Sequence, residues 1–284
     1  MLNRLLAISL LLLLLASCAA DTIKRADSPR NRQQVSREQV LAQQSIPVYR
    51  YKIIKAFPHN VSSYTEGLQL HDGYLYESTG RYNQSKLLKT DMQSGRIIQE
   101  HSLSPEYFGE GLAILGNRVF QLTYKSNIGF VYDSQSFKLE KTFSYPAQGW
   151  GLTTDGSELI MSDGSAALIF LNPDTLEQTR YITVSDSYGE VGFLNDLVYV
   201  DGEIFANVWQ TDLIARISPQ TGKVTAWIDL TGINPDPQTL IYPYVLNGVT
   251  YNSDTGNLIV AGKCWPLLFE IELVPEKNMA KSNQ

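Results

Sequence analysis

Thr65-Glu66-Gly67-Leu68 is the first of five short segments that resemble one another along the chain. The others are Gly109-Glu110-Gly111-Leu112, Gly149-Trp150-Gly151-Leu152, Leu194-Asn195-Asp196-Leu197 and Leu246-Asn247-Gly248-Val249. Their second positions are separated by 44, 40, 45 and 52 residues. A repeat of this length is typical of the blades of a β-propeller, each of which is a four-stranded antiparallel sheet.

Each repeat has the pattern of two hairpins. A turn such as Asp201-Gly202 follows the first strand, and a second strand rich in β-branched and aromatic residues comes next. We expect the second strands at residues 74–78, 119–124, 159–162, 204–209 and 258–262. A further hairpin then completes the blade, as residues 213–217 and 223–228 do in the fourth repeat. No segment requires a helix, so the sequence predicts an all-β fold.

The last repeat supplies only three strands before the chain reaches a polar tail at residues 276–284. The alternating stretch 48–57 precedes the first repeat and resembles the outer strands of the other blades. We expect it to pair as the outer strand of the last blade, because an unpaired sheet edge would otherwise stay exposed. The prediction is therefore a five-bladed β-propeller of four-stranded antiparallel blades over residues 47–275, with the N-terminal strand closing the last blade.

The first 18 residues have the features of a lipoprotein signal peptide. The apolar run 5–15 is too short to span a bilayer, and it ends in Leu15-Ala16-Ser17-Cys18, which resembles a bacterial lipobox. We therefore expect lipidation at Cys18. The polar segment 19–46 is predicted to be a flexible tether. The expected location is the cell envelope, and Ala19 favours the outer membrane, facing the periplasm, in a Gram-negative host.

Charge and cysteine content limit the classes of binding partner that the protein can have. Residues 1–46 carry a net charge of about +3 against −6 for the whole chain, which leaves about −9 on the remainder. An acidic body without a basic stripe argues against nucleic acid. Cys264 is the one thiol left if Cys18 is lipidated, so no disulfide is expected, and the half-buried thiol is expected to be a bystander. We expect a monomer that meets the membrane through its lipid anchor only.

A propeller brings equivalent ends of its inner strands together on one face, so the repeats predict a pocket there. The second positions of the repeats contribute Glu66, Glu110, Trp150, Asn195 and Asn247. The ends of the second strands add Thr79, Tyr124, Asp163, Trp209 and Lys263. Carboxylates, amides, indoles and one ammonium on a single rim indicate a binding or catalytic site.

Other chemistries have little support in the sequence. His59, His71 and His101 are scattered without zinc-site spacing, so neither a metal nor another cofactor is expected. We interpret His59 as fixing the turn at residues 57–60. The chain also lacks a phosphate-binding Gly-Lys-Ser/Thr loop and a Gly-x-Ser-x-Gly nucleophile turn.

Across roughly residues 50–273 the chain resembles the plant and bacterial type of glutaminyl-peptide cyclotransferase. The resemblance rests on the order and spacing of several motifs together. They are Phe57-Pro58-His59, Tyr64-Thr65-Glu66-Gly67-Leu68, Tyr76-Glu77-Ser78-Thr79-Gly80, Phe108-Gly109-Glu110-Gly111-Leu112, Gly149-Trp150-Gly151-Leu152, Met161-Ser162-Asp163-Gly164-Ser165, Asn207-Val208-Trp209-Gln210-Thr211-Asp212 and Gly262-Lys263-Cys264-Trp265-Pro266.

The resemblance implies a metal-independent five-bladed propeller that closes the N-terminal glutamine of peptides or proteins into pyroglutamate and releases ammonia. It implies Glu110 as the acid/base carboxylate, Asn195 and Lys263 as polar partners, and Trp150 and Trp209 as pocket walls. With the rim residues, the expected substrate-binding set is Glu66, Tyr124, Trp150, Asp163, Trp209 and Asn247. Two positions depart from the family pattern, because Glu66 stands where Gln is usual and Tyr124 where Trp is usual.

Two other functions stay open at this point. A calcium-dependent propeller hydrolase of the lactonase kind also collects carboxylates and amides on a channel rim, although an ammonium there repels a cation and indoles cannot ligate it. A non-catalytic propeller could instead serve as a binding module of the envelope.

Overall fold

The computed structural model describes residues 34–43, 45–234 and 244–276. Within them the fold is built almost entirely from strands, as the sequence predicts. Three sheets have four strands each, in sequence order and antiparallel. Their strands are β2 (Thr65–His71), β3 (Tyr74–Thr79), β4 (Lys86–Asp91) and β5 (Arg96–Ser102); β6 (Gly109–Leu115), β7 (Arg118–Thr123), β8 (Ile128–Asp133) and β9 (Leu139–Ser144); and β10 (Leu152–Thr154), β11 (Leu159–Ser162), β12 (Ala167–Leu171) and β13 (Gln178–Thr183).

The remaining strands form one eight-stranded sheet in the order β14-β15-β16-β17-β1-β20-β19-β18. These strands are β14 (Leu194–Val200), β15 (Glu203–Val208), β16 (Leu213–Ile217), β17 (Val224–Asp229), β18 (Leu246–Asn252), β19 (Asn257–Gly262), β20 (Leu267–Pro275) and β1 (Val48–Pro58). β1 pairs with β20 in antiparallel fashion from Tyr49 to Pro58, whereas its parallel contact with β17 involves only Val48 and Tyr49. The sheet is thus two antiparallel groups of four strands joined at one corner.

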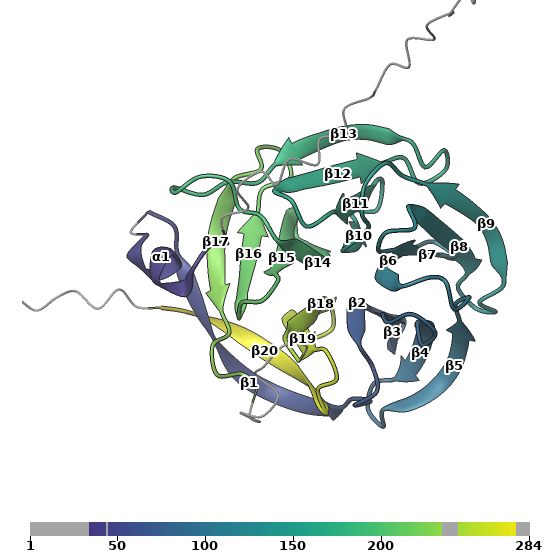
Figure 1. Ribbon diagram of the computed structural model, residues 1–284. Coiled ribbons are helices and arrows are strands. Elements are labelled where there is room, and N and C mark those ends of the chain that lie inside the picture. Colours follow the sequence, from purple (N-terminus) through teal and green to yellow (C-terminus); the bar gives the residue numbers. More distant parts are fainter. Residues whose placement is uncertain (1–33, 44, 235–243, 277–284) are drawn as a thin grey trace, which may run out of the picture. The chain divides into compact units, whose positions relative to one another are not determined.

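The sheets are arranged around a common centre, as in a propeller, with the first strand of each group innermost (Figure 1). The predicted second strands match the observed strands β3, β7, β11, β15 and β19 to within one residue at each end. Inner strands such as β6 are buried along nearly their whole length, whereas outer strands such as β9 and β13 are largely exposed. This gradient follows from the arrangement, because inner strands have neighbours on both faces.

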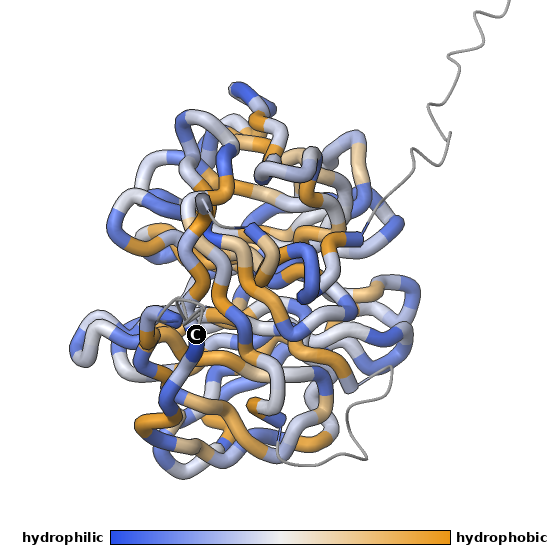
Figure 2. Tube along the Cα trace, turned by 90° about the vertical axis from the view of Figure 1, so that its left-hand side faces the viewer, coloured by the Kyte–Doolittle hydropathy of each residue, from blue (hydrophilic) through white to orange (hydrophobic). Residues whose placement is uncertain are grey.

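Apolar side chains fill the space between successive sheets. Phe120 of β7 packs in one cluster with Leu152 and Leu159 of the next sheet, and all three are fully buried. Figure 2 shows the hydrophobic stretches inside the molecule and hydrophilic residues along the loops. Burying each side chain of this size contributes about 1.5–3 kcal/mol, and the clusters recur between neighbouring sheets.

The inner strands approach one another backbone to backbone at the third position of the first three repeats, Gly67, Gly111 and Gly151. A Cβ atom on Gly67 would lie 2.6 Å from the amide nitrogen of Leu112, and one on Gly111 would lie 2.5 Å from the carbonyl carbon of Gly151. Only glycine allows such close contact. The fourth repeat has Asp196 at this position, and its carboxylate accepts the Val249 N–H of β18 at 2.8 Å.

The segment before β1 differs from the expected flexible tether. A short helix, α1 (Arg37–Ala42), begins with a capping box between Ser36 and Gln39. Val40 is fully buried in the cluster around β14–β17, and Arg37 Nε lies 2.7 Å from Asp229 Oδ2. A helix this short is not stable alone, so these tertiary contacts hold it in place. The tether prediction is therefore wrong for residues 34–43, because composition does not reveal two valines that match an apolar surface elsewhere.

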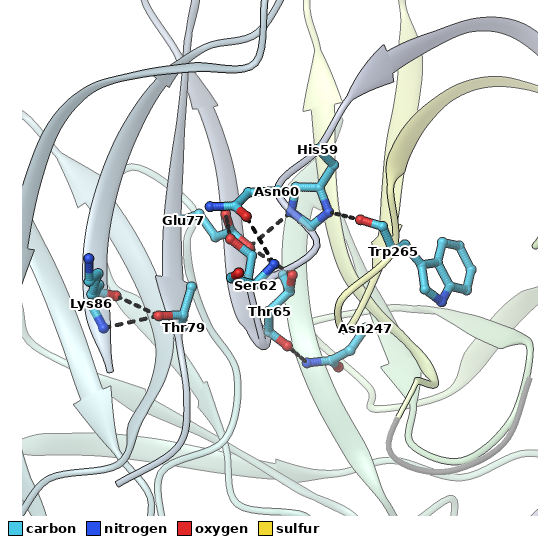
Figure 3. Close-up of polar contacts among 10 residues, drawn as sticks. His59, Asn60, Ser62, Thr65, Glu77, Thr79, Lys86, Asn247 and Trp265 are labelled. Carbon is cyan, nitrogen blue, oxygen red and sulfur yellow. Dashed lines mark hydrogen bonds and ion pairs between the residues drawn. The ribbon is translucent and has the colours of Figure 1, made fainter. Parts of the chain in front are cut away.

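A buried polar network joins the start of the first sheet to the end of β19 (Figure 3). His59 Nδ1 contacts the Trp265 carbonyl at 2.8 Å, and His59 Nε2 lies 3.1 Å from Glu77 Oε1. Glu77 also accepts hydrogen bonds from Ser63 and Thr65 at 2.9 and 2.7 Å. His59 therefore does more than fix a local turn, because it links two segments about 200 residues apart in sequence.

His59 should make stability depend on pH. Burial lowers its pKa, but the charge of Glu77 and the hydrogen bonds to Glu77 and Trp265 outweigh this, so the net shift is upward. A histidine whose pKa is higher in the folded state stabilises the fold. This stabilisation is fully present below the unfolded pKa of about 6.5 and is lost as the pH rises through the folded pKa. We expect His59→Gln to cost about 3–5 kcal/mol at pH 6 and less at pH 9.

Urea unfolding of both proteins between pH 6 and 9 measures this difference. A gap in unfolding free energy that stays constant across that range would contradict the His59–Glu77 ion pair.

Candidate active site

β-Bulges set the direction of the central polar side chains. In β2, β6, β14 and β18 the pairing with the second strand shifts register at the repeat motif, around Glu66, Glu110, Asn195 and Asn247 respectively. A bulge adds an unpaired residue, bends the strand and redirects its side chain. The repeat therefore encodes a local irregularity that recurs in four of the inner strands and places a polar residue near the centre each time.

A cavity of about 390 Å³ opens at this end of the inner strands. Seven of the nine predicted site residues line it, namely Glu66, Glu110, Tyr124, Trp150, Asn195, Trp209 and Lys263. Tyr64, Arg81 and Phe108 complete the lining. The structure thus brings these seven repeat-equivalent residues together around one cavity.

The polar part of the cavity is a chain of contacts between buried groups. Lys263 Nζ lies 2.5 Å from Glu66 Oε1, and Asn247 Nδ2 donates to Glu66 Oε2 at 3.2 Å. The carboxyl groups of Glu66 and Glu110 are hydrogen-bonded to each other. Glu66, Glu110 and Lys263 are each at most 5% exposed, so these charges interact with little screening by water.

The two carboxyl groups differ in how readily they ionise. Burial raises the pKa of Glu110 well above its usual range, and the adjacent Glu66 raises it further. Burial raises the pKa of Glu66 too, but the Lys263 ammonium in contact with it opposes that change. Glu66 is therefore the carboxylate that stays charged beside lysine, and Glu110 is the group that holds the shared proton.

Aromatic rings form a continuous wall around the cavity. Phe108 lies between Tyr64 and Tyr124, with ring centroids 6.2 and 5.8 Å away. Trp150 follows at 6.5 Å from Tyr124, and Trp209 lies 5.5 Å from Trp150 in an edge-to-face arrangement. Such a wall suits a small substrate that must be held in one shape while water is excluded.

Two predicted binding residues do not line the cavity. The Asp163 carboxylate accepts hydrogen bonds from the backbone N–H and hydroxyl of Ser165 at 2.9 and 2.5 Å, so it caps the turn after β11. Asn247 is fully buried behind Glu66 and also donates to the Thr65 carbonyl at 2.9 Å. The repeat predicts at which end of a strand these residues lie but not the direction of the side chain. In the structure Asn247 holds Glu66 in position, and Asp163 stabilises the turn after β11. Thr79 is buried outside the cavity lining, and its hydroxyl accepts the Lys86 backbone N–H at 3.0 Å.

Three lining residues were missed from the sequence. Tyr64 and Phe108 each stand two positions before the central carboxylate of their repeats, and Phe193 is the equivalent residue in the fourth repeat. An aromatic residue at this repeat position is a signal that could have identified Tyr64 and Phe108. Arg81 has no equivalent in the other repeats, so no repeat pattern indicates it.

Among the residues that the structure describes, no group of three or more His, Cys, Asp or Glu side chains is placed to hold a metal ion. In the same part of the chain, no helix has the length and apolarity needed to cross a membrane. Cys264 is buried beside the cavity, and burial raises the pKa of its thiol, which keeps it protonated.

The fold is propeller-like, and its cavity joins a buried carboxyl group of raised pKa to an aromatic wall, a combination that suits acid–base chemistry. The model of the family named glutamine cyclotransferase matches residues 23–273, so the chain belongs to that family. A glutaminyl-peptide cyclotransferase of Arabidopsis thaliana is 40% identical over 229 residues, which cover 78% of this chain and 71% of the plant protein. The crystal structure of Myxococcus xanthus glutaminyl cyclase superposes with a TM-score of 0.76 at 30% identity and covers 82% of this chain and 100% of that one.

Proposed function

We propose that the protein converts the N-terminal glutamine of peptides or proteins into pyroglutamate and releases ammonia. The observation that carries this proposal is Glu110, a buried carboxyl group with a raised pKa at the polar end of an aromatic cavity. The reaction needs one group that can both accept and donate a proton near neutral pH, and Glu110 meets that need.

The reaction follows from the position of Glu110. Its carboxylate takes a proton from the substrate ammonium, and the freed amine forms a bond to the side-chain amide carbon. Glu110 returns a proton to the amide nitrogen, the old carbon–nitrogen bond breaks, and ammonia leaves. The ring nitrogen then gives its remaining extra proton to the same carboxylate. Ionised Glu110 with a substrate ammonium and protonated Glu110 with a free substrate amine hold the same number of protons. The reaction can therefore start from either pair, so the raised pKa of Glu110 is compatible with these steps.

The other lining residues orient the substrate and stabilise charge. Lys263, anchored by Glu66, provides positive charge for the oxyanion that develops on the amide carbon, and the Asn195 side-chain amide can donate to the same oxygen. Asn195 Oδ1 is buried and has no hydrogen-bond partner among the described residues, so it can also accept an N–H of the substrate. The aromatic wall folds the glutamine side chain back on its own amine, which raises the effective concentration of the nucleophile.

The alternatives fit the cavity less well. A calcium-dependent hydrolase would need free carboxylate oxygens around a bound cation. In this cavity the Lys263 ammonium already occupies the place next to the Glu66 carboxylate. A binding module has no need to bury two hydrogen-bonded carboxyl groups, because burying charge is costly unless it serves a function.

We also propose that the scaffold is a five-bladed propeller whose last blade is closed by β1. Five groups of four hydrogen-bonded strands support this, with β18, β19, β20 and β1 as the fifth. The antiparallel ladder between β1 and β20 runs over almost the whole of β1, so it joins the two ends of the repeat array with backbone hydrogen bonds.

We further propose that the protein is exported and lipid-anchored through Cys18, with residues 1–18 as its signal peptide. The lipobox-like Leu15-Ala16-Ser17-Cys18 supports this proposal. These residues lie outside the part that the structure describes. The described part of the chain begins at residue 34, so 15 residues of sequence separate it from Cys18.

A purified protein with the proposed activity should release ammonia from a short peptide that begins with glutamine and leave a pyroglutamyl product lighter by one ammonia. Activity should survive chelators, because the polar groups in the cavity pair with one another. A coupled ammonia assay with mass spectrometry measures both. Absence of product from every glutaminyl peptide would support a binding role, and activity lost with a chelator and restored by a metal would contradict metal independence.

Replacing Glu110 with Gln keeps the size of the side chain but prevents proton transfer. Turnover should fall by about 100-fold to 10,000-fold with little change in melting temperature. Glu66→Gln is the matched control, and it should retain activity with the acid limb of its pH profile shifted to lower pH. The shift is downward because the variant removes a negative charge that raises the pKa of Glu110 and leaves Lys263 free to lower it. Normal turnover in Glu110→Gln with an inactive Glu66→Gln would transfer the catalytic role to Glu66.

Cys18→Ala should abolish lipidation and release the protein from membranes while the purified protein stays active, because the change lies outside the repeat array. Cell fractionation with an activity assay on both fractions tests this. A processed Cys18→Ala protein that still sediments with membranes would argue against the lipid anchor.

If β1 closes the last blade, the amides that it donates to β20 should exchange hydrogen as slowly as the paired amides of another outer strand. Hydrogen exchange of peptides covering residues 50–57, compared with residues 96–102 of β5, measures this. Exchange of the 50–57 segment that is fast while β20 stays protected would contradict closure by β1.

A further inference from the structure

Arg81 stands apart from the other polar residues of the cavity. It follows β3 at the start of a tight connection to β4, and its backbone has φ of 83°, in the left-handed region that disfavours a branched or long side chain. Its carbonyl accepts hydrogen bonds from Gln84 N and Ser85 Oγ at 3.0 and 2.8 Å, and Gly80 N–H donates to the Tyr64 carbonyl at 2.8 Å. These contacts hold an unfavourable conformation that directs Arg81 to the cavity lining.

The Arg81 guanidinium forms no ion pair among the described residues. Lys263, the other cation of the lining, is paired with Glu66, whereas no carboxylate in the described ranges lies within 4.0 Å of the Arg81 guanidinium. The guanidinium instead lies over the Tyr64 ring, 4.5 Å from its centroid. Tyr64 also contacts Lys263, with Nζ 4.4 Å from the same centroid. The cavity thus presents one cation that is already neutralised and one that is available.

Arg81 lies toward the open end of the cavity. It is partly exposed, whereas Glu66, Glu110 and Lys263 are buried. Its neighbour Tyr82 is 48% exposed and lies with its ring centroid 5.5 Å from that of the lining residue Phe108. With the substrate's amine at Glu110, these two partly exposed residues lie where the next residue of a peptide can contact them.

We propose that Arg81 binds a carboxylate of the substrate close to its N-terminal glutamine, so that the protein favours peptides with Glu or Asp at the second position. The inference rests on the proposed cyclisation. A guanidinium stacked on an aromatic ring is held in a planar orientation that offers two N–H groups to a carboxylate. A free C-terminal carboxylate of a dipeptide would present the same chemistry, and it is distinguished from a side chain by amidation.

The experiment compares kcat/KM for Gln-Glu-amide, its neutral counterpart Gln-Gln-amide and Gln-Lys-amide, with Gln-Ala and Gln-Ala-amide testing the terminal carboxylate. Gln-Glu-amide should exceed Gln-Lys-amide by about tenfold, the size of one charge-assisted hydrogen bond. Arg81→Gln should remove the preference and Arg81→Glu should reverse it in favour of lysine. If Arg81→Gln reduced the preference for Gln-Ala over Gln-Ala-amide more than the preference for Gln-Glu-amide over Gln-Gln-amide, Arg81 would bind the terminal carboxylate instead, and the side-chain proposal would be wrong.

Lys125→Gln is the matched control, because Lys125 lies 4.7 Å from the Tyr124 ring near the cavity but does not line it. It should keep the wild-type ratio. Equal rates for all peptides, or an equal loss of preference in Lys125→Gln, would overturn the assignment. If the Arg81 variants do not fold, the wild-type preference should still weaken with added salt. If no peptide releases ammonia, the proposed activity fails, and calorimetric binding of the same peptides still tests Arg81, with equal affinities ruling it out.

Discussion

The close approach of the inner strands at the centre is the constraint on which the rest of the structure depends. Gly67, Gly111 and Gly151 let neighbouring backbones come so near that any side chain would collide, and Gly111 N–H bonds directly to the Trp150 carbonyl at 2.6 Å. Side chains satisfy other inner-strand amides across the sheets, as Gln69 does for Ile114 at 2.7 Å and Thr250 for Leu70 at 2.8 Å. The sheets are therefore held in register at the same place where their functional residues meet.

The site follows from that convergence. Bulges next to the close contacts direct Glu66 and Glu110 toward each other, and the neighbouring sheets remove both from water. Two carboxyl groups at one buried point cannot both be freely ionised, so the lysine that pairs with Glu66 leaves the proton with Glu110. The raised pKa of Glu110 is thus produced by burial and by the positions of its neighbours rather than by Glu110 alone.

The polar network around His59 couples the scaffold to the site. Glu77 fixes Thr65, whose carbonyl holds Asn247, and Asn247 in turn holds Glu66. On the other side, the Cys264 amide donates to the Ser63 carbonyl at 2.7 Å, next to Lys263. The residues that connect β2, β18 and the end of β19 are therefore the same ones that hold Glu66 and Lys263 in contact, so this junction supports both the fold and the polar end of the cavity.

The sequence by itself determined the all-β class, the strand positions and seven of the lining residues, because a repeated motif places equivalent residues at one end of equivalent strands. Tertiary structure alone decided which of these side chains face the cavity, since Asn247 and Asp163 share the predicted height but turn to Glu66 and to a local turn. It also decided the packing of α1 and the position of Arg81 in the cavity lining, because both depend on surfaces contributed by distant segments. Repeat spacing carries position along a strand, whereas side-chain direction and pairing arise only when separate strands meet.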